Sequence, residues 1–166
     1  VIDNAALPLV IKGKEKKEAR EAAKKHFREF GLEGTEYKYP HQLSGGMRQR
    51  VALIRTLVLD PEILLLDEPF SALDYQTRLN VSDDIGQIIR REEKSALLVT
   101  HDLSEAISLA DRVIILTKRP ATILQTIPLI FHLENDTPFN RRNSPEFKNY
   151  FNLIWKELNE NENDIT

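Results

Sequence analysis

A glycine-rich turn and an acidic pair behind an apolar run are the residues of this sequence best suited to chemistry. The turn is Ser44-Gly45-Gly46, which precedes a segment with helical periodicity. Glycine lets the backbone approach an anion closely, and a helix N-terminus offers N–H groups and partial positive charge. The pair Asp67-Glu68 follows the apolar residues 63–66, and adjacent carboxylates can hold a magnesium ion and a water. Together these residues predict nucleotide chemistry.

Two further motifs follow in the chain. Asp74 closes a Ser-Ala-Leu-Asp sequence just after the acidic pair, and His101 follows the apolar segment 96–100. In this order, the four motifs resemble those of the ATP-binding-cassette (ABC) ATPases, and the resemblance covers residues 1–130. It implies an α/β fold of the P-loop NTPase (RecA-like) type. Such a fold has a parallel sheet with helices on both faces and an α-helical subdomain, here incomplete at the N-terminus.

The resemblance implies catalytic and metal-binding roles for three residues. Asp67 matches the residue that holds Mg²⁺, and Glu68 matches the general base that polarises the attacking water. His101 matches the switch histidine, which contacts the γ-phosphate and helps to position that water. The residues alone leave other roles open. The acidic pair can simply end a strand, and Asp102 with Glu105 can form a capping box for the next helix.

The resemblance also implies that the protein works as a dimer. Ser44, Gly45 and Gly46 match the signature motif, which reaches across the dimer interface to the γ-phosphate, and Gln49 belongs to the same nucleotide-binding segment. Asp74 matches the D-loop aspartate at that interface. The implied cofactors are ATP and Mg²⁺. As alternatives, Ser44 and Asp74 can each cap a helix, and the pattern does not separate these roles.

The sequence contains no G-x-x-x-x-G-K-[ST] phosphate loop. Its Gly13-Lys14 pair continues into Glu15 and lacks the earlier glycine that the motif needs. We expect the family's phosphate loop to lie upstream of Val1, which makes this chain the C-terminal part of a cassette. Because the loop's amides and lysine hold the phosphates, an alternative is a truncated cassette that is catalytically inactive.

The composition excludes several other classes. With 166 residues, 41% of them hydrophobic and 30% charged, the chain suits one ordinary globular domain. The net charge of −3, and the acids interleaved with the lysines of residues 12–25, argue against a nucleic-acid partner. The absence of cysteine excludes disulfides and thiolate metal sites. Since no apolar run is long enough to cross a bilayer, we expect work at a membrane to proceed by docking to another chain.

The C-terminal residues narrow the resemblance to one branch of the family. Arg119-Pro120-Ala121 and the segment 144–158 look like the nitrate, sulfonate and taurine importers. This implies the ATP-hydrolysing subunit of an importer, paired with a second ATP-binding subunit and docked to transmembrane permease subunits at the cytoplasmic face of the cell membrane. An external solute-binding protein would act indirectly. The alternative is a soluble, non-transport ABC ATPase, a class that tends to carry coiled-coil insertions or paired cassettes.

The periodicity predicts the elements that position these residues. We expect three parts: a helical subdomain with the signature motif (1–62), the C-terminal part of the nucleotide-binding core (63–130), and a loop with an amphipathic helix (131–166). Strands are expected at residues 63–66, 96–100 and 113–116, and an edge strand or strand pair at 122–130. Helices are expected at 15–30, 47–59, 75–92, 103–110 and from 145, and loops at 1–10 and 136–144. The apolar strand 63–66 should be buried on both faces. Ligands of such sheets bind at the carboxyl ends of the strands, where Asp67, Glu68 and His101 lie.

Overall fold

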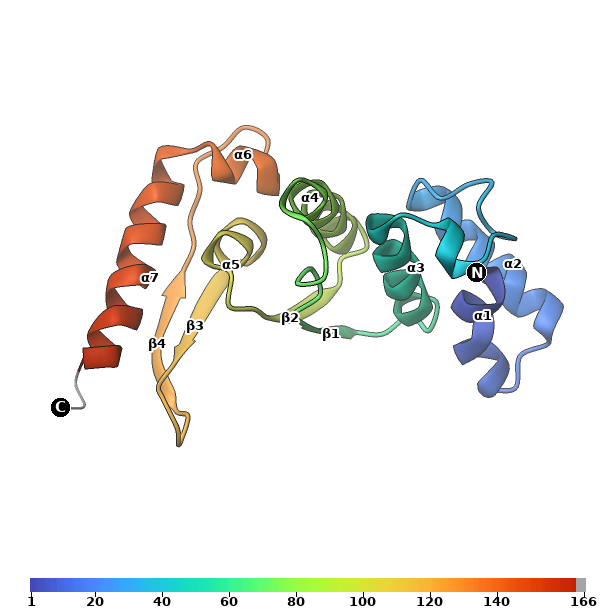
Figure 1. The fold of residues 1–166 in the computed structure, drawn as a ribbon, viewed down its shortest axis with the longest axis horizontal. Helices are drawn as coiled ribbons and strands as arrows, with labels where there is room; N and C mark the ends of the chain where they lie inside the picture. The colour runs from blue at the N-terminus through green and yellow to red at the C-terminus, as the bar shows by residue number, and fades with distance from the viewer. Residues whose placement is uncertain (164–166) are drawn as a thin grey trace. The chain divides into compact units, whose positions relative to one another are not determined.

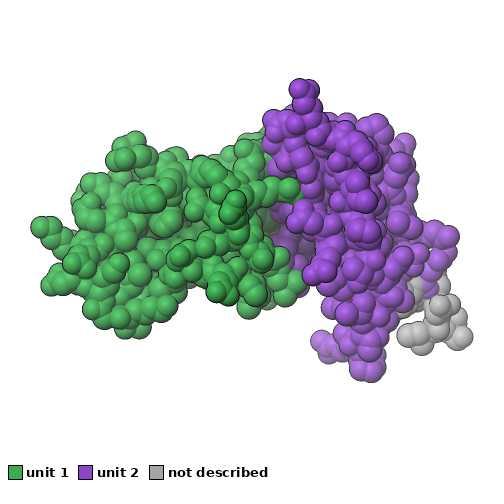
Figure 2. Space-filling model, turned by 180° about the vertical axis from the view of Figure 1, so that it is seen from behind, with its two compact units in different colours: residues 1–97 green, residues 98–166 purple. Residues whose placement is uncertain are grey.

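The chain divides into two compact units. The computed structural model describes residues 1–163; one unit is residues 1–97, and the other begins at residue 98 (Figure 2). The boundary falls inside a strand. The predicted three-part organisation stays a prediction, and residues 164–166 of its last part lie outside the described residues.

Three helices precede the first strand in the first unit. They are α1 (Ile2–Ile11), α2 (Lys16–Glu29) and α3 (Gly45–Leu57), with the short 3-10 helix η1 (Pro40–Gln42) before α3 (Figure 1). The helix predicted at 15–30 is confirmed as α2, which buries Ala23 and Phe27. The predicted loop at 1–10 is wrong, because α1 occupies it. Ala5 and Ala6 are buried there, so packing against α2 and α3 stabilises a segment with little periodicity of its own.

The first unit continues through β1 (Ile63–Asp67) and α4 (Tyr75–Arg91) into β2 (Ser95–Val99), which pairs with β1. The predicted burial of the first strand on both faces is wrong. Leu64 is fully buried, but Ile63 is 60% exposed and Leu65 is 73% exposed. Side chains alternate between the two faces of a strand, so only one face of β1 is covered. The apolar run correctly predicted a strand but not its surroundings.

The second unit has its own hydrophobic core. It contains α5 (Leu103–Leu109), β3 (Arg112–Leu116), β4 (Ile123–Pro128), α6 (Pro138–Arg142) and α7 (Pro145–Asn163). The strands β3 and β4 pair in antiparallel register, with Val113 opposite Ile127. The core consists of buried side chains from α5, β3, β4, the residue after β4, and α7: Ile107, Ile115, Ile127, Leu129 and Ile154. The predicted C-terminal helix is confirmed as α7, which packs its apolar face on this core.

A buried arginine ties the loop after β4 to α5 and α6. Arg141 is 3% exposed, and its guanidinium donates to both carboxylate oxygens of Asp136, at 2.5 and 2.7 Å, and to the carbonyl of Ala110 at 2.6 Å. The same group lies 4.7 Å from the centre of the Phe131 ring. Arg141 belongs to α6, where a loop was predicted. The predicted loop at 136–144 is wrong here, because Thr137 caps this helix and Pro138 begins it, which is a local signal for a helix start.

The chain shows part of an α/β fold. In the described residues, strands form two separate pairs, β1 with β2 and β3 with β4, in place of the one parallel sheet that was predicted. The antiparallel partner of β3 is the segment predicted as an edge strand or strand pair, and it is a single strand. Within residues 1–163, no helix is long and apolar enough to span a membrane.

Candidate functional site

The glycine-rich turn opens α3 as predicted. Ser44 is the N-cap, and its Oγ accepts a hydrogen bond from the Met47 amide at 3.3 Å. The helix begins at Gly45, two residues earlier than the periodicity suggested, so Gly45 and Gly46 form its first turn. Amides of a first turn have no partner within the helix, which is why a helix N-terminus can bind an anion. Gln49 lies one turn further along and is half-buried.

The two glycines also allow two helices to approach each other closely. A Cβ atom on Gly46 would lie 2.7 Å from Cγ2 of Val81 and 3.2 Å from Cγ2 of Thr77, both on α4. A Cβ on Gly45 would lie 3.1 Å from Cδ2 of Leu73. Gly45 and Gly46 therefore have a packing role in addition to the predicted contact with a nucleotide. The sequence motif alone could not reveal this packing role, because the contacted residues lie far along the chain.

Asp74 caps α4 at this same contact. It is exposed, and its carboxylate accepts a hydrogen bond from the Thr77 amide at 3.0 Å. Hydrogen bonds from the side chain and then the amide of Thr77 lower the pKa of Asp74 below its ordinary value. Since Thr77 also faces Gly46, the structure brings the glycine-rich turn and Asp74 together at the start of two packed helices.

The acidic pair lies at the carboxyl end of β1, as predicted. Asp67 is the last residue of the strand and is exposed; Glu68 follows it and is half-buried. The backbone of Glu68 has a positive φ of 45°, a left-handed conformation that a side chain disfavours. Its carbonyl accepts hydrogen bonds from the Ser71 amide at 3.3 Å and the Ser71 hydroxyl at 3.0 Å. These bonds hold the strained turn, and backbone strain of this kind is concentrated at functional sites.

The donor chemistry of this pair fits magnesium bound together with a nucleotide. Among the described residues, no group of three or more His, Cys, Asp or Glu side chains gathers as a metal site. Mg²⁺ needs only one or two carboxylates when substrate phosphates and waters supply its other ligands. Asp67, exposed beside Glu68, can offer such a carboxylate.

His101 belongs to the second unit and is exposed, so its approach to Asp67 and Glu68 stays a prediction. It lies between β2 and α5, as the strand and helix pattern predicted. Asp102 caps α5 by accepting from the amides of Ser104, at 2.8 Å, and Glu105, at 3.2 Å. The Glu105 side chain accepts instead from the Thr100 hydroxyl at 2.8 Å, and that hydroxyl accepts from the Asp102 amide at 3.0 Å. The predicted capping box is therefore indirect: the Glu105 side chain reaches the Asp102 amide through the Thr100 hydroxyl.

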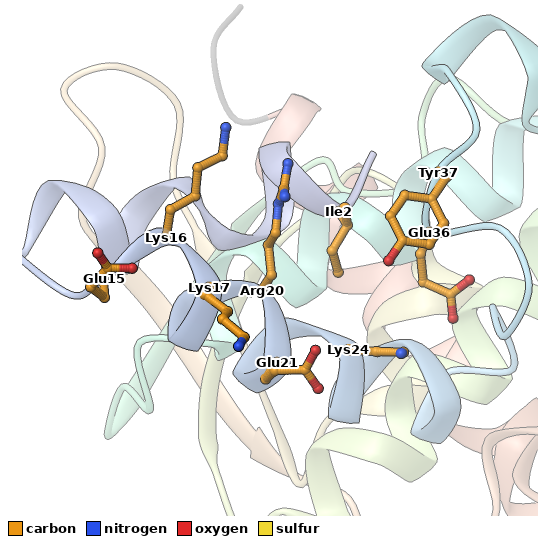
Figure 3. Close-up of a pocket in the computed structure, with 9 residues that line it drawn as sticks. All are labelled: Ile2, Glu15, Lys16, Lys17, Arg20, Glu21, Lys24, Glu36 and Tyr37. Carbon is orange, nitrogen blue, oxygen red and sulfur yellow. The ribbon is translucent and has the colours of Figure 1, made fainter.

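A hollow of about 360 Å³ lies elsewhere in the first unit (Figure 3). Residues of α1, α2 and the following loop line it, among them Lys17, Arg20 and Tyr37. Arg20 is engaged by the carboxylate of Asp3, at 2.6 and 2.9 Å. None of the residues that line it is a predicted site residue.

Comparison with known proteins agrees with these motifs. The family model described as ABC transporter matches residues 2–71. The chain is 45% identical over 157 residues to an uncharacterized ABC transporter ATP-binding protein of Bacillus subtilis (strain 168), covering 95% of this chain and 60% of the relative. It is 38% identical over 170 residues to the nitrate import ATP-binding protein of Synechocystis sp., covering 100% of this chain and 64% of that protein.

A third relative is the aliphatic sulfonates import ATP-binding protein of Bacillus licheniformis, 47% identical over 128 residues, with 76% of this chain and 48% of that protein covered. The chain thus spans about half to two thirds of the length of these relatives. A solved metal-chelate type ABC transporter in an inward-facing conformation matches with a TM-score of 0.64 and 20% identity, covering 74% of this chain and 50% of that chain. This likeness concerns the fold alone.

Proposed function

We propose, from the premise that this chain belongs to the ABC transporter ATP-binding proteins, that it forms a catalytic part of an importer's ATP-hydrolysing subunit. In this proposal the subunit pairs with a second copy and docks on membrane permease subunits at the cytoplasmic face. The observation that carries the proposal is Glu68, a carboxylate held in a strained left-handed turn at the end of β1 and directly beside Asp67.

Glu68 would act as the general base. A base has to be held within hydrogen-bond reach of the water that it activates. The Ser71 bonds to the Glu68 carbonyl fix the backbone from which the side chain starts, so the carboxylate is presented from one defined position. Asp67 would hold Mg²⁺, which supplies charge neutralisation for the phosphates when it is bound. His101 would contact the γ-phosphate.

The first turn of α3 would bind phosphate oxygens of a nucleotide held by the other subunit. Ser44, Gly45 and Gly46 place a helix N-terminus there, and Gln49 lies further along the same helix. Asp74 would contact the partner at the same interface, because its helix start packs against that of α3. This arrangement makes each site depend on both subunits, so that ATP binding favours pairing.

The imported solute would be a small anion such as nitrate, a sulfonate or taurine. Support comes from two similar proteins, one named as a nitrate import ATP-binding protein and one as an aliphatic sulfonates import ATP-binding protein. The solute need not touch this subunit, so its identity is to be measured on the assembled transporter. Stimulation of ATP hydrolysis by nitrate, taurine and an alkanesulfonate, each supplied with the binding protein, would identify it.

The test of the catalytic proposal is Glu68→Gln in the complete gene product. We expect turnover of ATP to fall by about 100-fold or more, because a general base contributes on this scale, while ATP binding is retained. Glu62→Gln is the matched control, since Glu62 is an exposed carboxylate just before the same strand. Equal turnover in the Glu68 variant would remove this residue from the base role. A wild-type gene product that hydrolyses no ATP would instead favour the inactive cassette.

A further inference from the structure

The residues on either side of His101 are joined by a short hydrogen-bonded relay. The Asp102 amide donates to Oγ1 of Thr100 at 3.0 Å, and the Thr100 hydroxyl donates to Oε2 of Glu105 at 2.8 Å. All four residues lie in the second unit. The bond between Asp102 and Thr100 spans His101 only, because these two residues are its neighbours in the chain.

Glu105 is an unusual residue to find at this place. It is 6% exposed, and a buried carboxylate is costly unless hydrogen bonds and local charge compensate it. Thr100 supplies one such bond, and the first turn of α5 adds its partial positive charge. The bond of 2.8 Å to Oε2 of Glu105 orients the Thr100 hydroxyl.

Direct capping of α5 by Asp102 is complete without this relay. The carboxylate of Asp102 already caps α5 by accepting from the amides of Ser104 and Glu105. The further bond between Thr100 and Glu105 restrains the backbone that precedes the helix. That backbone carries His101.

We propose that Thr100 and Glu105 are positioning residues for His101. The inference rests on the function proposed above, in which His101 meets the γ-phosphate. The relay fixes the backbone before and after this residue, so the imidazole starts from one defined direction. Neither Thr100 nor Glu105 need touch the nucleotide. A displacement of about 1 Å in such a group can lower a rate on the order of 100-fold.

The first measurement uses the chain itself. Thr100→Val removes the hydroxyl at nearly constant volume, and Glu105→Met removes the acceptor at similar size. In both variants we expect faster hydrogen exchange at the Asp102 amide and a shifted ring signal of His101 in the NMR spectrum. Thr100→Ser and Glu105→Gln keep the hydroxyl and an acceptor oxygen, and should restore both signals.

The second measurement uses the complete gene product. Thr100→Val and Glu105→Met should each lower kcat by about 10-fold or more while KM for ATP changes little, because an interaction that matters in the transition state is weakened. The double variant should lose no more than either single variant, since the two residues act through one bond. The matched control is Thr137→Val, which removes a cap hydroxyl of α6 in the same unit.

The outcomes separate this inference from the proposed function. An active wild-type protein in which Thr100→Val keeps the wild-type kcat and His101 signal overturns the positioning role alone. The same holds if Thr137→Val lowers kcat as much as Thr100→Val, since general destabilisation then explains the loss. A wild-type protein without ATP hydrolysis overturns the proposed function and this inference with it.

Discussion

At the scale of single residues, Glu68 combines a functional candidate with a measurable strain. Its φ of 45° lies in the left-handed region, where a side chain costs about 1–2 kcal/mol. We therefore expect Glu68→Gly to keep or raise the free energy of unfolding in urea, whereas a glycine in an ordinary conformation lowers it. Glu68→Gln should leave the free energy of unfolding unchanged, because the backbone strain remains.

Glu62→Gly serves as the control for this prediction, because Glu62 is not among the residues with positive φ. That variant should lose about 0.5–1 kcal/mol through the greater freedom of the unfolded chain. If Glu68→Gly lost as much, the turn after β1 would not be strained.

Asp74 predicts how this part of the chain responds to acid. The Thr77 side chain and amide lower the pKa of Asp74 below the ordinary 3.8, so the folded state favours the carboxylate. The resulting stability is present above pH 3.8 and is lost as the pH falls through the lower folded value. Asp74→Asn still offers a cap oxygen but does not titrate.

Urea unfolding of the wild type and Asp74→Asn, measured across this pH range, tests the point. Above pH 3.8 the wild type should have the larger free energy of unfolding, and its advantage over Asp74→Asn should disappear in acid. Other carboxylates titrate alike in both proteins, so their contributions cancel in the difference between the two free energies of unfolding. A difference that is independent of pH would show that the charge of Asp74 contributes nothing.

At the scale of elements, the contact between α3 and α4 depends on the absence of a side chain. We expect Gly46→Ala to destabilise the first unit by about 1–3 kcal/mol, because the added methyl overlaps Cγ2 of Val81 at 2.7 Å. Gly45→Ala should cost less, since its contact at 3.1 Å is with the end of the Leu73 side chain, which can move.

Val81→Ala should rescue Gly46→Ala if the overlap is the cause. The double-mutant cycle, measured by urea unfolding, should then give a favourable coupling between the two positions. Additive losses would place the cost in the helix start itself. The same result bears on function, because any bulky residue at position 46 would disturb folding as well as nucleotide contact. Dimerisation assays on such variants therefore need this stability control.

At the scale of the whole molecule, the exposed apolar side chains of the strands set its solution behaviour. Leu65 is 73% exposed and Leu97 is 53% exposed, on strands that pair with each other. Uncovered apolar surface of this kind favours association. We expect the isolated chain to associate with rising concentration in light scattering and to bind a hydrophobic dye, and Leu65→Lys to reduce both.

Leu153→Lys is the matched control, because Leu153 is 41% exposed on α7, in the other unit. It should leave association nearly unchanged if the surface of β1 and β2 is responsible. An equal reduction by both substitutions would indicate a general effect of added charge instead.

Much of the local structure follows from the sequence because its causes are local. Ser44, Asp74 and Asp102 cap the helices that begin directly after them, through bonds that span two or three residues. The periodicity of α2, α3 and α7 and the apolar run of β1 likewise predict element type. The ordered motifs were sufficient to indicate the family. The roles of the site residues stay predictions, since they concern a nucleotide and a partner.

The tertiary structure alone decided what depends on segments far apart in the chain. The burial of α1, the exposed face of β1, and the approach of Gly46 to Val81 come from packing, which no short pattern encodes. The position of Arg141 over Phe131 and beside Asp136 likewise required the fold. Hydrogen bonds to near neighbours are set by residue type and spacing. Contacts between distant segments are set by which surfaces the folded backbone brings together.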